Sequence, residues 1–204
     1  MKTLSNKKII LLTAFFSITM VGLLFVFHLQ QAPVKTSLSN DAGTIFPSAR
    51  DVQSFKLIDG THQAFSNQQF TNHWTLLFFG YTHCGNVCPM TLSLLNRAYQ
   101  QLQQKYPLLQ VVFISLDPER DTPAALLKYT QSFNPRFIGV TGKLQDIRKL
   151  QSQFGIFATQ DMNNEIVHTS SVLLINPQGQ WAGLFKSGLN ANELADAFKE
   201  AVRA

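Results

Sequence analysis

The sequence predicts an α/β sandwich with a central mixed sheet, preceded by one N-terminal transmembrane helix. Two observations predict the sandwich: buried strands alternate with amphipathic helices along most of the chain, and a hairpin followed by a helix closes it. A long uncharged run after a short basic leader predicts the membrane helix. At 204 residues and 45% apolar content, the chain has room for one domain with a buried core and for appendages.

The N-terminal run from Ile9 to Phe27 contains no charged residue. As a helix it would span roughly 28 Å, close to the thickness of a bilayer's hydrocarbon core. Lysines precede the run and no acidic residue appears before Asp41, so we expect a cytoplasmic N-terminus and an exported remainder. A cleaved signal peptide is the alternative, although its apolar region should be shorter, at roughly 7–15 residues, and should end in a small-x-small site.

A polar segment rich in Gln, Pro, Ser, Asn and Gly separates this run from the first strand pattern, and its composition suits a tether. We therefore expect a cytoplasmic leader at residues 1–8, a transmembrane anchor at 9–29, a linker at 30–50 and a globular domain at 51–204.

The first half of the globular domain alternates strands with a helix. A short strand at residues 55–60 ends in a turn. Residues 75–81 form a continuous apolar run that suits a central strand buried on both faces. Apolar residues at helical spacing predict a helix over residues 87–102, and a second buried strand is expected at 110–116.

The next two elements are helices. Thr122 as the cap and Pro123 at the first helical position predict where one begins. A further helix is expected at residues 144–154, again from apolar spacing.

The chain closes with a hairpin and a helix. A strand at residues 171–176 turns through 177–179 into a return arm at 181–185. Asn190 with Glu193 resembles a capping box that begins a last helix. This order of elements looks like the thioredoxin arrangement.

The formal charge of +5 comes mainly from lysines that precede the globular domain, and it therefore indicates membrane topology. Without the leader and linker lysines, 13 basic residues face 12 acidic ones, and no Lys/Arg cluster remains. We therefore expect no nucleic-acid binding. The lysines left out of this count are Lys2, Lys7, Lys8 and Lys35.

Cys84 and Cys88 are the only cysteines, and they lie where the chain turns from a predicted central strand into a helix. Such a turn opens at the sheet edge where ligands bind, and a helix N-terminus stabilises a thiolate. A thiolate is both a nucleophile and a metal ligand, so the spacing leaves metal binding and thiol–disulfide exchange open. A structural disulfide is a third possibility, but it would close a very short loop and contribute little stability.

His168 is the third candidate, because it shortly precedes the strand at residues 171–176 and its loop could fold over the Cys84 turn. A lone histidine is more often a surface or core residue than a ligand, so its role stays open here. His83 adjoins Cys84 but would point to the opposite side of the backbone, as a possible supporting group. The remaining histidines have weaker positions: His28, His62 and His73.

Three segments together resemble the Sco/SenC family of copper proteins, which are membrane-anchored thioredoxin-like domains of cytochrome oxidase assembly. The segments are residues 79–89, 115–123 and 168–171, and the resemblance covers nearly all of residues 51–203. It implies that three residues are metal ligands for copper: Cys84, Cys88 and His168. Two thiolates and an imidazole suit Cu(I), and a harder oxygen ligand would accommodate Cu(II).

Asp117 occupies the place of a family acidic residue suspected of that auxiliary role, although a turn or capping carboxylate is the other interpretation. The chain departs from the family pattern at Gly85-Asn86, where many members carry Pro-Asp, and at Val167, where many carry Asp. Both departures remove negative charge near the site.

The resemblance implies a copper metallochaperone. From the topology and a bacterial-looking leader we expect it in a bacterial inner membrane, with its domain on the outer face. It would deliver copper to, or mature, the CuA site of cytochrome c oxidase subunit II. The alternative is a thiol–disulfide oxidoreductase that reduces the CuA-site cysteines, or acts in redox or copper sensing, with Cys84 and Cys88 as catalytic residues. Further implied partners are an upstream copper donor or a thioredoxin-like reductant, and the membrane through the N-terminal helix.

Overall fold

The computed structural model describes residue 20, residue 38, residues 41–160 and residues 166–203. The chain divides into two units, residues 1–35 and 36–204, and the fold below is that of the second unit. Among the described residues, no helix is both long and apolar enough to cross a bilayer. The leader predicted at 1–8 and the anchor predicted at 9–29 lie outside the described residues, apart from Met20.

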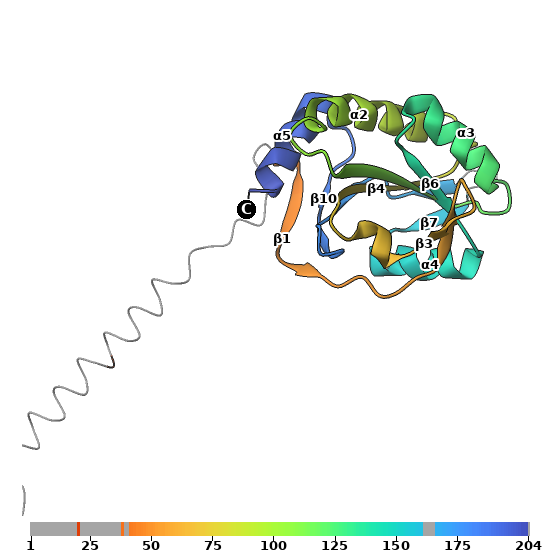
Figure 1. Ribbon diagram of the computed structural model, residues 1–204, viewed down its shortest axis with the longest axis horizontal. Helices are drawn as coiled ribbons and strands as arrows, with labels where there is room; N and C mark the ends of the chain where they lie inside the picture. Colours follow the sequence, from red (N-terminus) through yellow and green to blue (C-terminus); the bar gives the residue numbers. More distant parts are fainter. Residues whose placement is uncertain (1–19, 21–37, 39–40, 161–165, 204) are drawn as a thin grey trace, which may run out of the picture. The chain divides into compact units, whose positions relative to one another are not determined.

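The second unit is a thioredoxin-like α/β sandwich in which helices cover both faces of one mixed sheet (Figure 1). Eight strands form this sheet in the order β1-β10-β9-β4-β5-β6-β2-β3, and β7 pairs with β8 in a small second sheet. The sheet is mixed because β4, β5 and β6 are parallel, whereas β9 runs antiparallel to β4. In chain order the elements are β1 (Gly43–Arg50), β2 (Leu57–Asp59), β3 (Ala64–Phe65), the 3-10 helix η2 (Asn67–Phe70), β4 (Trp74–Gly80), α2 (Val87–Leu102), β5 (Leu109–Ser115), α3 (Pro123–Phe133), β6 (Ile138–Thr141), α4 (Leu144–Gln153), β7 (Ala158–Gln160), β8 (Ile166–His168), β9 (Val172–Ile175), β10 (Trp181–Phe185) and α5 (Ala191–Ala201).

Strand β4 is buried on both faces, as its continuous apolar run predicts. Leu76 and Phe78 face a core that α2, α3 and α5 cover. Leu77 and Phe79 face a second core that α4 covers from the other side. Figure 1 shows these two helical layers with the sheet between them.

The predicted ends of several elements are confirmed. The Thr122 side chain accepts the N–H of Ala125 at the start of α3, with a proline in the first turn. Asn190 and Glu193 form the complete capping box of α5. The turn between β9 and β10 contains Gly179 at φ +77°, a conformation that glycine adopts without steric cost.

Several elements differ from the sequence prediction, which did not contain β3, η2 or β7. Residues 43–50, assigned to the linker, form the edge strand β1 paired with β10, so the folded unit begins before residue 51. Pro47 made this segment resemble a loop, and an edge strand tolerates proline. Strand β6 was missed because it is four residues long and contains Gly139. His168 ends strand β8 rather than lying in a loop.

Candidate metal and thiol site

The site lies at the edge of the sheet where the parallel strands β4 and β5 end. Gly80 and Ser115 are paired in the last register position, and the N–H of Leu116 donates to the carbonyl oxygen of Gly80 at 2.7 Å. The cysteine turn leaves this edge from β4, and the chain from His168 enters β9, which is antiparallel to β4, at the same edge. In open α/β sheets, ligands bind outside the carboxyl ends of the parallel strands, which is this edge.

Cys88 is fully buried in the first turn of α2. Its sulfur fits because residue 80 is glycine: a Cβ there would lie 2.9 Å from Cys88 Sγ and 2.7 Å from a ring carbon of Phe113. Burial raises the pKa of the Cys88 thiol well above its ordinary value, and a hydrogen bond with the backbone of Tyr81 offsets only part of this. Cys88 therefore stays a neutral thiol near pH 7 unless a metal ion replaces its proton.

Cys84 is half-buried, and its sulfur accepts the backbone N–H of Cys88 at 3.3 Å. The cap residue of α2, Asn86, makes no side-chain capping bond, so the sulfur of Cys84 accepts an N–H at the start of this helix. Burial alone would raise the pKa of Cys84, but hydrogen bonds from the backbone of Cys88 and Asn86 help to lower it below its ordinary value. Cys84 is thus the thiol that ionises first.

His168 is half-buried, with its Nε2 atom 3.7 Å from Cys88 Sγ. Its other nitrogen, Nδ1, lies 2.9 Å from the carbonyl oxygen of Thr169. A carbonyl oxygen can only accept, so we assign the proton to Nδ1, which leaves the Nε2 lone pair facing the sulfur. Burial lowers the pKa of His168, and the Thr169 hydrogen bond offsets only part of this.

Cys88 is in contact with both His168 and Cys84, but the three side chains do not surround one point. Metal bonds to sulfur and nitrogen of about 2.3 and 2.0 Å, the lengths known for zinc, place two such ligand atoms roughly 3.5–3.7 Å apart. The 3.7 Å between Cys88 Sγ and His168 Nε2 fits this spacing. Across residues 41–160 and 166–203, however, no three His, Cys, Asp or Glu side chains stand in a preformed metal-holding arrangement. The thiol of Cys84 is turned toward the start of α2 instead.

The other predicted residues take no part in the contact between Cys88 and His168. Asp117 forms an ion pair with Arg120, and its backbone oxygen accepts the N–H of Asp121, as expected of a turn carboxylate. His83 is about half exposed, and its Nδ1 lies 3.1 Å from the hydroxyl of Thr82 and 3.7 Å from Oδ1 of Asp121. His62 is exposed on the loop after β2, and His73 precedes β4 at the opposite end of that strand from the thiols.

Sequence reasoning missed one buried carboxyl group beside the site. Asp121, with 0% of its surface exposed, accepts hydrogen bonds from Thr82 and Ser115. The sequence alone did not single out Asp121, because its burial depends on how β4 and β5 pair.

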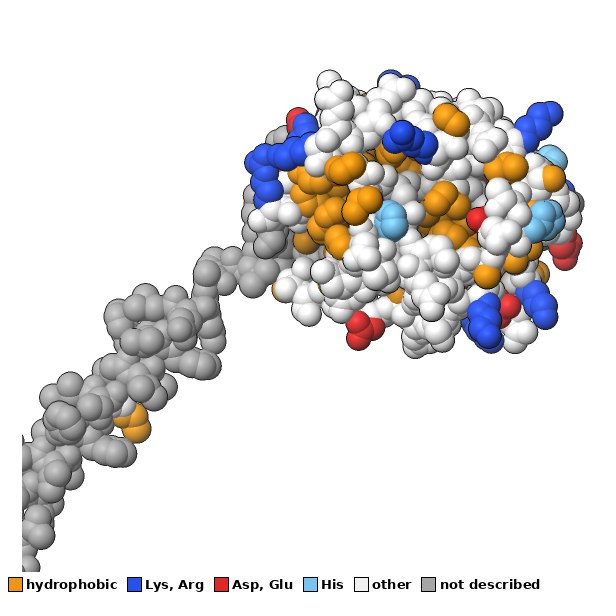
Figure 2. All heavy atoms as spheres, viewed as in Figure 1, with side chains coloured by type: hydrophobic (Ala, Val, Ile, Leu, Met, Phe, Trp, Pro, Cys, Tyr) orange, Lys and Arg blue, Asp and Glu red, His pale blue; other side chains and the backbone are white. Residues whose placement is uncertain are grey.

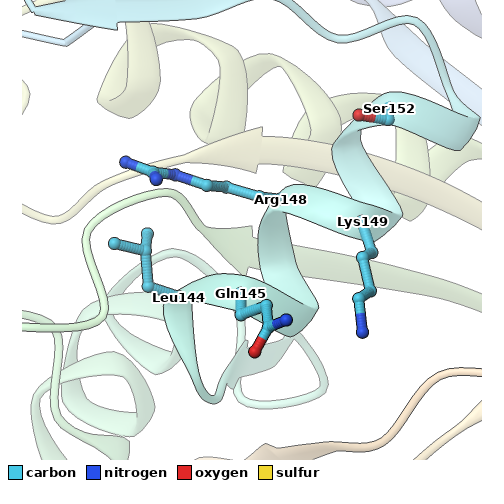
Figure 3. Close-up of a pocket in the computed structure, with 5 residues that line it drawn as sticks. All are labelled: Leu144, Gln145, Arg148, Lys149 and Ser152. Carbon is cyan, nitrogen blue, oxygen red and sulfur yellow. The ribbon is translucent and has the colours of Figure 1, made fainter.

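Hollows also lie elsewhere on the domain. One lies along α4, where the side chains of Arg148 and Lys149 point in different directions (Figure 3). It contains no thiol, imidazole or carboxyl group. On the face drawn in Figure 2, Lys and Arg side chains are dispersed rather than gathered into one basic surface.

The fold and this site together define a thioredoxin-like protein with two free thiols and a histidine at the ligand-binding edge. The model of the SCO1/SenC family matches residues 46–203, and the chain belongs to this family. The resemblance that the three sequence segments indicated is thereby confirmed.

Relatives are found in animals and bacteria. The mitochondrial SCO2 homolog of Danio rerio is 31% identical over 152 residues, which cover 71% of this chain but 54% of that protein. This chain thus spans about half the length of that relative. An SCO2-like protein of Rickettsia prowazekii is 32% identical over 71% of this chain and 74% of its own. The structure of Bradyrhizobium japonicum ScoI with copper bound is 31% identical, with a TM-score of 0.65 over 73% of this chain and 98% of that one.

Proposed function

We propose that this chain is a copper metallochaperone and that Cys84, Cys88 and His168 are the residues that hold its cargo. The observation that carries the proposal is the position of His168, whose Nε2 lies 3.7 Å from Cys88 Sγ while its Nδ1 lies 2.9 Å from the carbonyl oxygen of Thr169. Two thiolates and one imidazole are the ligands that Cu(I) prefers, and a harder oxygen ligand would suit Cu(II). The copper-bound ScoI of Bradyrhizobium japonicum supports the choice of metal.

The acceptor we propose is the CuA site of cytochrome c oxidase subunit II, with an upstream copper donor loading the chain. Transfer would proceed by ligand exchange, in which a thiolate of the acceptor replaces one of this chain's sulfurs at a time. Cys84 suits the first exchange because it is half-buried, whereas Cys88 is enclosed by the core.

A membrane anchor at residues 9–29 belongs to this proposal, with the domain on the outer face of a bacterial inner membrane. The uncharged run from Ile9 to Phe27 and the lysines before it support this topology. We expect the full chain to stay in the membrane pellet after an alkaline carbonate wash, and a variant lacking residues 1–29 to be released. If the expressed full chain is instead found in the wash and lacks its N-terminal residues, the segment is a cleaved signal peptide.

The ligand set is tested by Cu(I) competition titration of the reduced full-length protein in detergent. We expect one tightly bound Cu(I) per chain, and a large loss of affinity in each of Cys84→Ser, Cys88→Ser and His168→Ala. His73→Ala is the matched control, because His73 lies at the far end of β4 and should not affect binding. Wild-type affinity in all three ligand variants would rule the proposal out.

Thiol–disulfide exchange is a second candidate, favoured by the opposite pKa shifts of the two thiols. The Cys84 thiolate would attack a disulfide of the acceptor and form a mixed disulfide, releasing one acceptor thiolate. Cys88, on losing its proton, would displace the second acceptor sulfur. The acceptor gains two electrons as a dithiol, and this chain is left as a disulfide that a thioredoxin-like reductant reduces.

His168→Ala separates the two candidates. A variant that loses copper but still supports oxidase assembly in cells would favour the reductase, and a variant that fails to support assembly would favour the metallochaperone.

A further inference from the structure

Asp121 has no part in the chemistry described so far, yet it is fully buried beside the cysteine turn. Its Oδ1 accepts the hydroxyl of Thr82 at 2.5 Å, and its Oδ2 accepts the hydroxyl of Ser115 at 2.7 Å. The backbone N–H of Thr82 donates to the same carboxyl group at 3.1 Å. Burying a carboxyl group costs free energy unless hydrogen-bond donors surround it. The donors of Thr82 and Ser115 therefore offset the cost of burying Asp121.

The carboxyl group is not needed to begin α3. Thr122 is the cap of that helix, and its own side chain accepts the N–H of Ala125. The side chain of Asp121, one residue earlier, instead joins the ends of β4 and β5. Replacing it would therefore disturb the loops at the sheet edge more than the helix that follows.

Thr82 lies two residues before Cys84, within a tight turn. The N–H of Cys84 donates to the carbonyl oxygen of Tyr81 at 3.3 Å, so the residues held by Asp121 and the residue carrying the sulfur belong to one turn. Cys88 is fixed independently, by its burial in the core against Gly80. A change at Asp121 should thus move Cys84 relative to Cys88 and His168.

We propose that Asp121 is the positioning residue of the cysteine turn and holds the Cys84 sulfur within reach of Cys88 and His168. The part of this inference that is measured by Cu(I) affinity rests on the proposed function. It also makes a claim about the metal-free protein, namely that the backbone from Thr82 to Cys84 is held in place by this side chain.

The test uses Asp121→Asn in the full-length protein. Asparagine keeps one acceptor oxygen and replaces the other by an N–H₂ donor, so it cannot accept from both Thr82 and Ser115. We expect Cu(I) affinity to weaken about 10- to 100-fold, the range for losing a residue that orients a metal ligand. In the metal-free protein, amide hydrogen exchange at Thr82 and Cys84 should speed up, whereas exchange in β9 should not.

Glu119→Gln is the matched control, because it removes the same charge from an exposed position in the same loop. Thr82→Val is a gentler second variant, which removes one hydroxyl donor without changing the shape of the side chain. If Asp121 acts through Thr82, the double variant Thr82→Val/Asp121→Asn should bind Cu(I) no more weakly than Asp121→Asn alone.

The outcomes separate this inference from the proposed function. Wild-type protein that binds no Cu(I) would remove the proposed function, and hydrogen exchange would still decide the role of Asp121. The second outcome is that wild-type protein binds Cu(I) and that both Asp121→Asn and Thr82→Val bind it within about twofold of the wild-type affinity. This outcome would overturn the inference about Asp121 and leave the proposed function in place. If Asp121→Asn does not fold, Thr82→Val decides by the same criterion.

Discussion

The two thiols of the site lie in different environments although they are close in sequence. Cys84 is half-buried and accepts a backbone N–H, whereas Cys88 is enclosed by the core. Hydrogen bonds favour the ionised form of the first, and burial disfavours the ionised form of the second. The pair therefore contains one thiol suited to exchange with a partner and one suited to retain what is bound.

This difference predicts selective alkylation. Because hydrogen bonds lower its pKa, Cys84 should react with iodoacetamide with a midpoint below that of an ordinary cysteine, and its rate should rise with pH through that midpoint. Cys88 should stay unlabelled in the native protein at neutral pH. Mass spectrometry after short labelling pulses measures both rates. In urea the two cysteines should react alike, and equal rates in the native protein would contradict the assignment.

Gly80→Ala tests the packing that positions Cys88. The added methyl group would meet Cys88 Sγ and the ring of Phe113 at less than contact distance. We expect the free energy of unfolding to fall by about 1–3 kcal/mol, the usual cost of overpacking a core. Gly85→Ala is the control, since a Cβ there meets nothing within 4 Å. Urea unfolding measures both, and an equal effect of the two substitutions would show that Gly80 is not a close-packed position.

The site residues themselves differ in how far the sequence could predict them. Residue type and motif were enough to select Cys84, Cys88 and His168. The closeness of His168 to Cys88 could not be derived from spacing, because strand pairing brings together residues 80 positions apart. Asp121 was out of reach for the same reason, since its partner Thr82 lies 39 positions away.

At the scale of elements, helix α2 begins without a side-chain cap from Asn86. The positive end of the helix is therefore available to the sulfur of Cys84, which accepts the N–H of Cys88. This position therefore connects helix stability with thiol chemistry.

Asn86→Asp should affect both properties. A negative charge at the helix N-terminus should stabilise the protein by about 0.3–1 kcal/mol. The same charge lies near Cys84 and should raise its pKa, so that alkylation of Cys84 shifts to higher pH. Gln145→Glu, in the first turn of α4, is a matched control that should stabilise without changing Cys84. Urea unfolding measures the stability, and the pH profile of alkylation measures the pKa of Cys84. An unchanged Cys84 profile in Asn86→Asp would contradict the expected effect of the added charge.

Elements with a strong local signal were predicted, and elements defined by tertiary pairing were not. The buried run of β4, the periodicity of α2 and the caps of α3 and α5 are local properties, and each is confirmed. Strands β1, β6 and β8 are short or contain Pro or Gly, and their neighbours in the sheet define them.

At the scale of the whole domain, the mixed sheet explains how distant segments form one site. Parallel pairing of β4 with β5 places the cysteine turn beside the loop of Asp121. Strand β9 runs antiparallel to β4, so β9 begins at the edge where β4 ends, and His168 lies just before it. The thioredoxin-like fold therefore brings a buried thiol and a half-buried thiol from one turn together with an imidazole from a distant part of the chain.

X-ray absorption at the copper edge, on the reduced full-length protein loaded with one equivalent of Cu(I), tests the central claim most directly. We predict two sulfur neighbours and one imidazole nitrogen, with the nitrogen contribution lost in His168→Ala and kept in His73→Ala. A spectrum with sulfur neighbours only, or one that His168→Ala leaves unchanged, would contradict the claim that His168 joins Cys84 and Cys88 around the metal.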